Sequence, residues 1–293
     1  MTIAARPARQ SDIDMAMAEA AKKGQAFRAL HGEPGAFVIP NPWDIGSARL
    51  LAALGFKALA TTSAGFAFSL GRPDGTVTRD EALAHCRAIA SAVDLPVSAD
   101  LEKGFGDSPE SAAETIRAAA GTGLAGCSIE DHTGRRDEPI FDFGLAVERI
   151  AAAAEAVRDL PHDFMLTARC ENFLWKRPDL DDTVRRLQAF EKAGADVLYA
   201  PGLRDLDSIR TVCASVRKPV NVLMGLAGAG FSVNELAEAG AKRISIGGAL
   251  ARLAYGAVIK AGREMKDAGT FSFASEAIGF AELENYFAPS SRR

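Results

Sequence analysis

The 293-residue sequence has few cysteines, no excess of positive charge and no long apolar run. Its four cysteines lie far apart without a Cys-x-x-Cys pair, which excludes a disulfide framework and a thiolate zinc site. A formal net charge of −4 gives no basic footprint for nucleic acid. No run is long enough to cross a bilayer, and the first residues lack the apolar segment of a secretory signal. We therefore expect a cytoplasmic protein with reduced thiols and no nucleic-acid or membrane partner.

Short apolar runs alternate with longer amphipathic ones along most of the chain. Hydrophobic residues make up 48% of the sequence, enough to bury one large core. The short runs predict strands at 36–40, 57–62, 96–100, 125–130, 164–169, 196–200, 219–223 and 242–246. The longer runs predict helices at 44–54, 78–93, 108–121, 142–159, 179–193, 205–216, 232–239 and 249–268.

This rhythm of about eight strand–helix units predicts a (β/α)8 TIM barrel of the α/β class, with a doubly wound open sheet as the alternative. A dinucleotide site has little support, because the glycines at 104 and 106 do not continue as Gly-x-Gly-x-x-Gly. One domain is expected over 1–293, with the barrel core at about 34–268. Residues 1–30 are predicted as a helical lead-in, with its helix at 12–30, and 270–293 as a tail with a short amphipathic helix.

Acidic side chains stand at the ends of two neighbouring predicted strands. Asp100 and Glu102 are two residues apart, so they share one side of an extended strand, and Gly104 and Gly106 allow a sharp exit. Glu130 ends the next strand. Because chemistry in such barrels gathers at the carboxyl ends of the strands, we expect these acids at one rim.

Crowded carboxylates repel one another and rise in pKa unless a positive charge lies among them. A divalent cation with oxygen ligands meets this need, and Mg²⁺ fits best because it needs few direct carboxylates and keeps several waters. The alternative is that the acids cap the following helices or pair with Arg72, Lys103 and Arg169.

Two further residue types near the strand ends are open to two interpretations. Cys127 and Cys170 lie on or beside strands and are expected to be buried small apolar residues rather than nucleophiles. His132 follows the fourth predicted strand, where it could transfer a proton or merely be solvated.

Five segments near the strand ends occur together in one order, and their aspartate, glutamate and glycine spacings are specific. They read Thr62-Ser63-Ala64-Gly65, Gly71-Arg72-Pro73-Asp74-Gly75, Asp100-Leu-Glu102-Lys-Gly104-Phe-Gly106, Ser128-Ile-Glu130-Asp131 and Thr167-Ala-Arg169. From about residue 34 to 268, the chain resembles the isocitrate lyase and phosphoenolpyruvate mutase superfamily. The resemblance implies a magnesium-dependent barrel, with Mn²⁺ as a possible substitute, that acts on 2-oxo or 2-hydroxy carboxylates.

The resemblance also implies roles for individual residues. Asp100 corresponds to the direct magnesium ligand, whereas Asp74, Glu102 and Glu130 correspond to acids that hold its waters. The substrate carboxylate would be bound by hydroxyl and amide groups and by one guanidinium, contributed by Ser63, Ala64, Gly65 and Arg169. The resemblance further implies a homo-oligomer, a tetramer or a dimer, with an exchanged terminal helix.

The loop after the fourth predicted strand departs from the pattern that the resemblance implies. Lyases of the superfamily carry a cysteine there that protonates the departing carbanion, whereas residues 132–139 contain none. His132 or a water would then deliver the proton. We expect this loop to act as a mobile cover, with Arg135 and Arg136 facing an anionic substrate; the alternative is a solvated turn with locally paired charges.

Three functions remain open at this point. The first is a carbon–carbon lyase or decarboxylase for a small oxo or hydroxy diacid such as oxaloacetate, in which a cation stabilises the enolate. The second is phosphorus–carbon chemistry of the mutase or phosphonopyruvate hydrolase type, in which Arg135 would face the phosphoryl group. The third is a barrel that binds a small carboxylate without turning it over.

Overall fold

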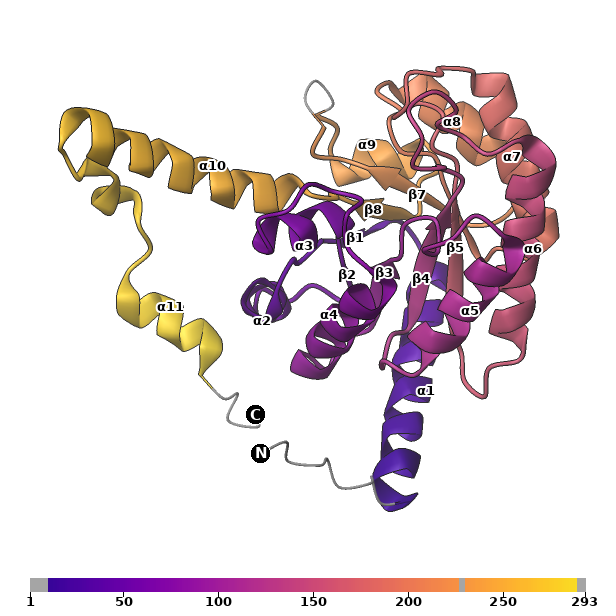
Figure 1. Cartoon of the computed structure of the whole chain (residues 1–293), viewed down its shortest axis with the longest axis horizontal. Coiled ribbons are helices and arrows are strands. Elements are labelled where there is room, and N and C mark those ends of the chain that lie inside the picture. The colour runs from indigo at the N-terminus through magenta and orange to yellow at the C-terminus, as the bar shows by residue number, and fades with distance from the viewer. Residues whose placement is uncertain (1–9, 227–229, 289–293) are drawn as a thin grey trace.

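The structure, a computed structural model, describes residues 10–226 and 230–288 and is built around an eight-stranded parallel sheet (Figure 1). The strands are β1 Phe37–Ile39, β2 Leu59–Ala60, β3 Val97–Asp100, β4 Gly126–Glu130, β5 Met165–Arg169, β6 Val197–Tyr199, β7 Val220–Leu223 and β8 Arg243–Ser245. They pair in the order β1-β8-β7-β6-β5-β4-β3-β2. The two outer strands of this order also meet, because the Ala60 N–H donates to the Pro40 carbonyl at 3.1 Å. The predicted (β/α)8 barrel is therefore confirmed.

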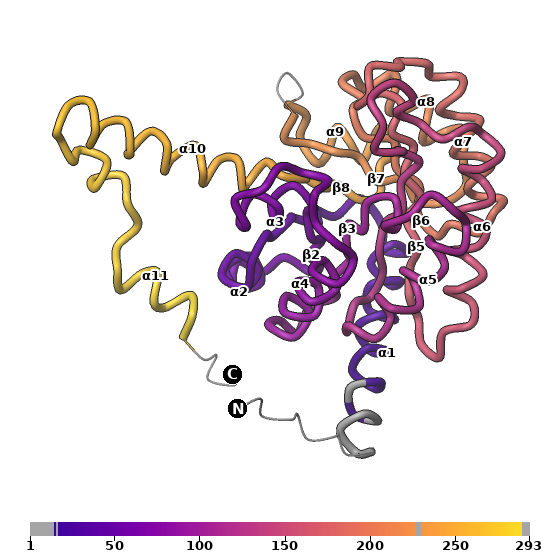
Figure 2. The backbone as a smooth tube through the Cα atoms, in the orientation of Figure 1, coloured from indigo at the N-terminus to yellow at the C-terminus, as the bar shows by residue number. Residues whose placement is uncertain are grey.

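Helices alternate with the strands and surround the barrel (Figure 2). They are α2 Ile45–Ala53, α4 Arg79–Ala92, α5 Pro109–Ala120, α6 Phe143–Arg158, α7 Leu180–Ala193, α8 Leu206–Ala214, α9 Val233–Glu238 and α10 Ala249–Arg263. Each observed strand and each of these helices falls within its predicted range. The short helix α3, Ser63–Ser69, is absent from the predicted set, because its seven residues are too few for a periodic pattern to stand out.

Side-chain caps explain where most of the helices begin. Eight residues that precede a helix each accept the backbone N–H three positions on: Asp44, Thr62, Thr78, Ser108, Asp142, Asp179, Asp205 and Ser232. Such a cap supplies a partner to an N–H that has none within the helix. At the other end of α7, Gly194 takes a φ of 112°, a conformation that side-chain-bearing residues rarely adopt.

The first helix, α1 Gln10–Gly32, contains the predicted lead-in helix and packs against the barrel end opposite the acidic strand ends. Phe27 and Leu30 of α1 form a buried cluster with side chains at the starts of several strands, including Met165 and Val197. The Lys23 ammonium donates to two carbonyls at the end of α4, at 2.9 Å each. The helix thus closes the floor of the barrel. Residues 1–9 of the predicted lead-in lie outside the described residues.

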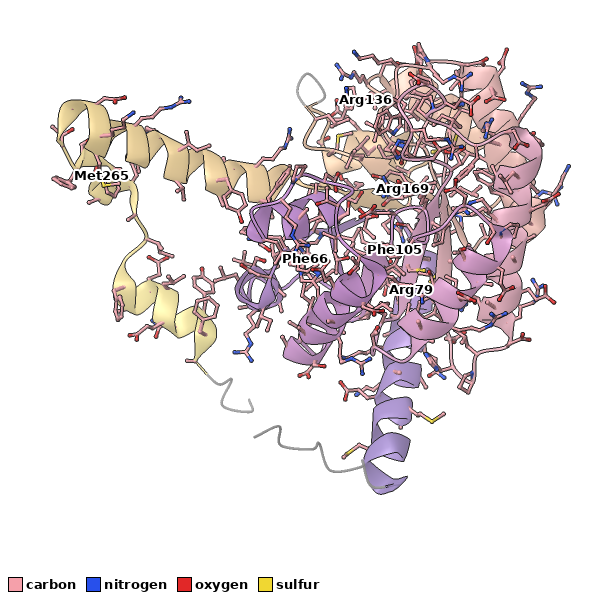
Figure 3. The ribbon with its side chains drawn as sticks, in the orientation of Figure 1. Phe66, Arg79, Phe105, Arg136, Arg169 and Met265 are labelled. Atoms are coloured by element: carbon pink, nitrogen blue, oxygen red, sulfur yellow. The ribbon has the colours of Figure 1, made fainter. Side chains whose placement is uncertain are left out.

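Beyond the last strand, α10 runs away from the barrel, and the chain then turns back (Figure 1). It continues through Glu264–Ala268 and Ser272–Glu276 to α11, Phe280–Phe287, which matches the predicted tail helix. Figure 3 shows Met265 at the far end of this arm. Several large apolar side chains of the arm are exposed: Leu253, Val258, Ile259, Met265, Phe271, Ile278, Phe280 and Phe287. Residues 289–293 of the predicted tail lie outside the described residues.

The cysteines and the helices agree with what the sequence predicts for them. Cys127 and Cys170 are free and fully buried in the main core, which confirms their interpretation as small apolar residues. Among the helices described, none combines the length and the apolar character needed to cross a bilayer. The assignment of the whole chain to one domain stays a prediction.

We predict that Phe27→Ala destabilises the protein because it leaves a cavity between α1 and the barrel floor. The phenyl ring is completely buried, and such truncations cost about 3–5 kcal/mol of unfolding free energy. Urea unfolding measures the loss. Met15→Ala, on the same helix at a side chain that is 66% exposed, is the control and should change stability by no more than about 0.5 kcal/mol. Equal effects of the two substitutions would show that α1 does not seal the floor.

Candidate active site

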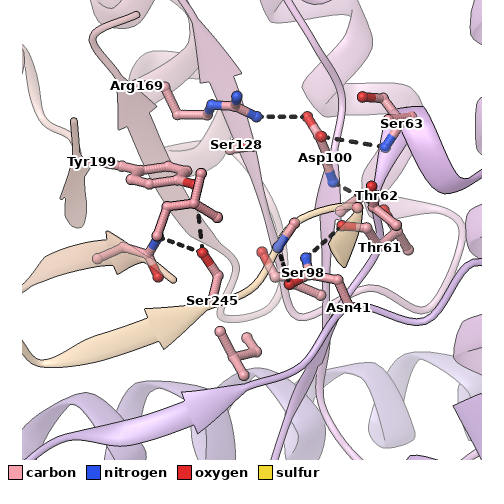
Figure 4. Close-up of a pocket in the computed structure, with 18 of the residues that line it drawn as sticks. Asn41, Thr61, Thr62, Ser63, Ser98, Asp100, Ser128, Arg169, Tyr199 and Ser245 are labelled. Carbon is pink, nitrogen blue, oxygen red and sulfur yellow. Dashed lines mark hydrogen bonds and ion pairs between the residues drawn. The ribbon is translucent and has the colours of Figure 1, made fainter. Parts of the chain in front are cut away.

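Two adjoining cavities open at the carboxyl ends of the strands. The inner one has a volume of about 180 Å³ and lies within the barrel (Figure 4). The outer one has a volume of about 310 Å³, and the two share Ser63, Asp74, Arg169 and Leu174 in their linings. Between them, the linings bring together most of the residues that the sequence predicts for the site: Ser63, Ala64, Asp74, Asp100, Glu102, Glu130, His132 and Arg169.

Arg169 lies at the centre of this region, at the end of β5. Its Nη1 donates to Asp100 Oδ1 at 2.9 Å, and its Nη2 lies 3.1 Å from Glu130 Oε2 and 2.7 Å from Glu171 Oε1. The Tyr199 ring lies below the guanidinium, 5.1 Å from its carbon (Figure 4). The strand register places Glu130 directly beside Arg169. The guanidinium therefore joins carboxylates from the ends of three adjacent strands.

Asp100 is held in place by backbone as well as by Arg169. Its own N–H donates to the Thr61 hydroxyl at 3.0 Å, and its Oδ2 accepts the Ser63 N–H at 3.3 Å. The Glu102 N–H reaches Oδ1 at 3.3 Å. Both carboxylate oxygens thus have fixed directions.

Glu102 and Asp74 lie in two separate loops, and both are near the charged groups of Asp100 and Glu130. Glu102 takes a φ of 49°, in the left-handed region that few side-chain-bearing residues occupy. Burial, with the charges of Asp100 and Glu130, raises the Glu102 pKa to about 8. Burial and the Asp100 charge likewise raise the pKa of Asp74. Besides burial, the charges of the neighbouring carboxylates contribute to both shifts, as expected where several acids lie around one guanidinium.

His132 lies in the outer cavity rather than in open solvent. Its ring stacks on Trp175, with 3.9 Å between centroids, and its Nδ1 lies 3.6 Å from Glu130 Oε1. Its Nε2 is buried and has no hydrogen-bond partner among the described residues. The imidazole is therefore placed, by one carboxylate and one aromatic ring, beside the acidic cluster.

The segment at the end of β2 supplies backbone and hydroxyl groups to the inner cavity. Ser63 and Ala64 line it, but Gly65 does not. The Gly65 N–H donates to the Thr62 hydroxyl at 3.3 Å, and a Cβ on this glycine would lie 2.8 Å from the Cβ of Trp43. Gly65 thus allows the chain to pack closely against Trp43. Its N–H can contact a substrate only if it first leaves the Thr62 hydroxyl.

The loop 132–139 is tied to the barrel by several bonds. Thr133 bonds to the carbonyl of Glu138 at 2.5 Å, and the Lys103 ammonium donates to the Thr133 carbonyl at 2.7 Å. Arg135 is half exposed and pairs with Asp107 at 2.7 Å. Arg136 lies farther from the barrel centre than Arg169 (Figure 3). Neither arginine lines the two cavities, so a catalytic part for Arg135 stays a prediction that requires the loop to move.

The structure adds site residues that the sequence did not single out. Glu171 and Tyr199 contact Arg169, and Asn221, Arg243 and Ser245 line the inner cavity. In the sequence, each of these residues is a polar side chain inside or just after a short apolar strand. Such a polar side chain in a barrel strand indicates a position that faces the interior. The alternative interpretation of the sequence paired the acids with Arg72, Lys103 and Arg169. Arg169 does pair with Asp100, whereas Arg72 pairs with Glu81 and Lys103 with Asp107.

The donor set fits a hard divalent cation. Within residues 10–226 and 230–288, no three His, Cys, Asp or Glu side chains are grouped so as to hold a metal ion by themselves. Mg²⁺ usually takes one or two carboxylates directly and keeps waters that other acids hold. One fixed carboxylate with three more nearby, all oxygen donors in a region with excess negative charge, matches this pattern.

Comparisons with known proteins show the family to which the chain belongs. A family model described as phosphoenolpyruvate phosphomutase matches residues 27–266. One solved structure, from Burkholderia cenocepacia J2315, is described as a lyase or mutase. It is 57% identical with a TM-score of 0.91, over 93% of this chain and 98% of that one. The 2-methylisocitrate lyase of Escherichia coli K12 is 32% identical over 205 residues, 67% of this chain and 68% of its own. Oxaloacetate acetylhydrolase, solved with the product oxalate, is 26% identical with a TM-score of 0.81, over 92% and 93%.

The barrel fold and these matches place the chain in a class of enzymes that includes lyases and mutases. The chain belongs to the phosphoenolpyruvate phosphomutase family, within the isocitrate lyase and phosphoenolpyruvate mutase superfamily.

We predict that the metal-free protein loses stability as the pH rises from about 5 to about 8. The pKa of Glu102 is near 8 in the folded protein against 4.5 ordinarily, so in this window the folded state binds a proton that the unfolded state has lost. Unfolding free energy therefore falls with pH. Glu102→Gln should flatten the slope in a chelator-containing buffer, whereas Glu238→Gln, at an exposed site, should not. A parent stability that rises across this window would contradict the shift.

Proposed function

We propose that the protein is a magnesium-dependent lyase or decarboxylase that acts on a carbon–carbon bond of a small 2-oxo or 2-hydroxy carboxylate or dicarboxylate such as oxaloacetate. The observation that carries the proposal is the set of carboxylates gathered around one guanidinium at the mouth of the barrel cavity: Asp74, Asp100, Glu102 and Glu130. The names of the lyase and acetylhydrolase relatives support a carbon–carbon cleavage.

Four carboxylates would hold the ion, one directly and three through its waters. Asp100 would bind it directly, because two backbone N–H groups and the Arg169 guanidinium orient its carboxylate. Asp74, Glu102 and Glu130 would accept hydrogen bonds from its waters. When bound, Mg²⁺ or Mn²⁺ supplies positive charge that stabilises the enolate left when a bond beside a carbonyl breaks.

Arg169 would bind the substrate carboxylate next to the ion. Its guanidinium is already fixed by carboxylates on one side and by the Tyr199 ring on the other, so it loses little freedom on binding. The Ser63 hydroxyl and the Ala64 N–H, which line the cavity, would orient the same carboxylate.

The proton that quenches the enolate would come from His132 or from a water. No cysteine stands in the loop 132–139, and His132 is the imidazole that borders the outer cavity. The His132 Nδ1 lies 3.6 Å from Glu130 Oε1, so the ring stands beside the carboxylates at the mouth of the cavity. Closure of the loop over the substrate, with Arg135 as its cationic contact, is part of the proposal and would exclude water.

The projecting arm supports the proposal of a homo-oligomer. Its large apolar side chains, among them Leu253 at 71% and Phe280 at 79%, are exposed in number on this segment, and exposed apolar surface of this kind is often covered by a partner. A tetramer or dimer in which α10 and α11 pack on another copy would bury them.

The first test is a turnover assay with Mg²⁺ and a panel of small acids. We expect oxaloacetate or a substituted malate to yield carbon–carbon cleavage products, whereas phosphonopyruvate and phosphoenolpyruvate should remain intact. Turnover of the two phosphorus compounds instead would favour the mutase chemistry for which the family model is named. Binding of acids without any product would favour a non-catalytic barrel and would contradict the proposal.

The second test is a calorimetric titration of Mg²⁺ into Asp100→Ala. We predict a loss of affinity of about tenfold or more, since a hydrogen-bonded or charged contact of this kind contributes about 1.5–3 kcal/mol. Asp207→Ala is the control, because its carboxylate is 93% exposed on α8. Unchanged affinity in Asp100→Ala would remove this residue from the metal site.

A further inference from the structure

The floor of the inner cavity holds a second guanidinium, that of Arg243, the first residue of β8. Its side chain crosses the barrel: Nε donates to Asn221 Oδ1 at 2.8 Å and Nη2 to the Thr167 hydroxyl at 3.0 Å. The residue is only 5% exposed, and its Nη1 has no hydrogen-bond partner in the part of the chain that the structure describes.

No carboxylate pairs with Arg243 among the described residues. Its hydrogen-bond partners are a neutral amide and a neutral hydroxyl. Burial lowers its pKa to about 10, so the side chain still carries its charge near neutral pH. His31, on the α1 side, offers no counter-charge, because burial and the Arg243 charge lower its pKa to about 3. A buried charge without a partner is costly, and Arg186, which pairs with Asp131 and Asp182, shows how this fold satisfies one elsewhere.

Arg243 and Arg169 line the same cavity from opposite ends. Polar contacts connect them, because the Tyr199 ring lies against Arg169 and the Ser245 hydroxyl lies 3.5 Å from the Tyr199 hydroxyl and 2.9 Å from Asn221 Nδ2. In Figure 4, Ser245 lies on the side of Tyr199 away from Arg169 and Asp100. The cavity is therefore acidic at its mouth and basic at its floor.

We infer that Arg243, with Asn221 and Ser245 beside it, forms a subsite for a second acidic group of the substrate. An acid that presents its oxo or hydroxy end to Asp100 and Arg169 would extend inward, and its far carboxylate or phosphonate would pair with the Arg243 guanidinium. The cavity, at about 180 Å³, is below the roughly 300 Å³ of sites for drug-sized ligands, so it suits a small diacid. This inference rests on the proposed function and narrows its substrate class to diacids.

The test uses pairs of ligands that differ only in the second acidic group. Lactate is malate without its far carboxylate, and pyruvate is phosphonopyruvate without its phosphonate. Each is titrated calorimetrically, with Mg²⁺ present, into the parent, Arg243→Met and Arg149→Met. Arg149 is a buried arginine that donates to main-chain carbonyls and lines neither cavity, so it controls for the removal of a buried guanidinium.

We expect the parent to bind at least one diacid more tightly than its monoacid partner, and Arg243→Met to reduce that preference about 10- to 100-fold, the range for a hydrogen bond to a charged group. Arg149→Met should keep the preference. The pair that shows the effect tells whether the group is a carboxylate or a phosphonate. A parent without preference in either pair, or a preference that survives in Arg243→Met, would overturn the inference.

Two further measurements separate the possible failures. Oxalate, as an enolate mimic, would use both of its carboxylates at the mouth and has no further acidic group, so its affinity should be the same in the parent and in Arg243→Met. If oxalate fails to bind the parent with Mg²⁺, the proposed function fails; if it binds but the diacid preference is absent, only the subsite fails. Thermal unfolding of Arg243→Met should show unchanged or higher stability, since an unpaired buried charge is removed. A marked loss of stability with an intact diacid preference would make Arg243 a structural residue.

Discussion

The ion-paired cluster around Arg169 is the interaction on which the rest of the site depends. One guanidinium holds Asp100 of β3, Glu130 of β4 and Glu171, which follows β5, within 3.1 Å. Burial of so many carboxylates without a cation would force them to take up protons or to move apart. The parallel register that sets Glu130 beside Arg169 makes the cluster a direct result of the barrel. Arg169 therefore holds the Asp100 carboxylate in a fixed orientation.

A second buried pair supports this cluster from outside. Asp131 pairs with Arg186 of α7 at 3.2 Å and accepts the Glu171 N–H at 2.8 Å. The helix layer thus fixes the backbone that presents Glu171 to Arg169. Together with Arg243 at the floor, these contacts give the cavity a charge that changes sign with depth, from the acidic mouth to the basic floor. A ligand that is anionic at one end and metal-binding at the other would enter in only one orientation.

Much of the fold and part of the site could be predicted because both depend on local pattern. Short apolar runs marked all eight strands, and strand ends in a barrel share one rim, which placed Asp100 and Glu130 together. Contacts between side chains of different strands and loops leave no such pattern in the sequence. The contact of Glu171 with Arg169, and the pairing of Arg135 with Asp107 rather than with a ligand, depend on side-chain directions that only the packed structure fixes.

The most direct measurement of the central claim is a crystal structure of the protein grown with Mg²⁺ and oxalate. The account predicts an ion on the Asp100 carboxylate, with waters toward Asp74, Glu102 and Glu130, and oxalate on the ion next to Arg169. An ion bound away from Asp100, or oxalate bound without any ion at the mouth of the cavity, would contradict it.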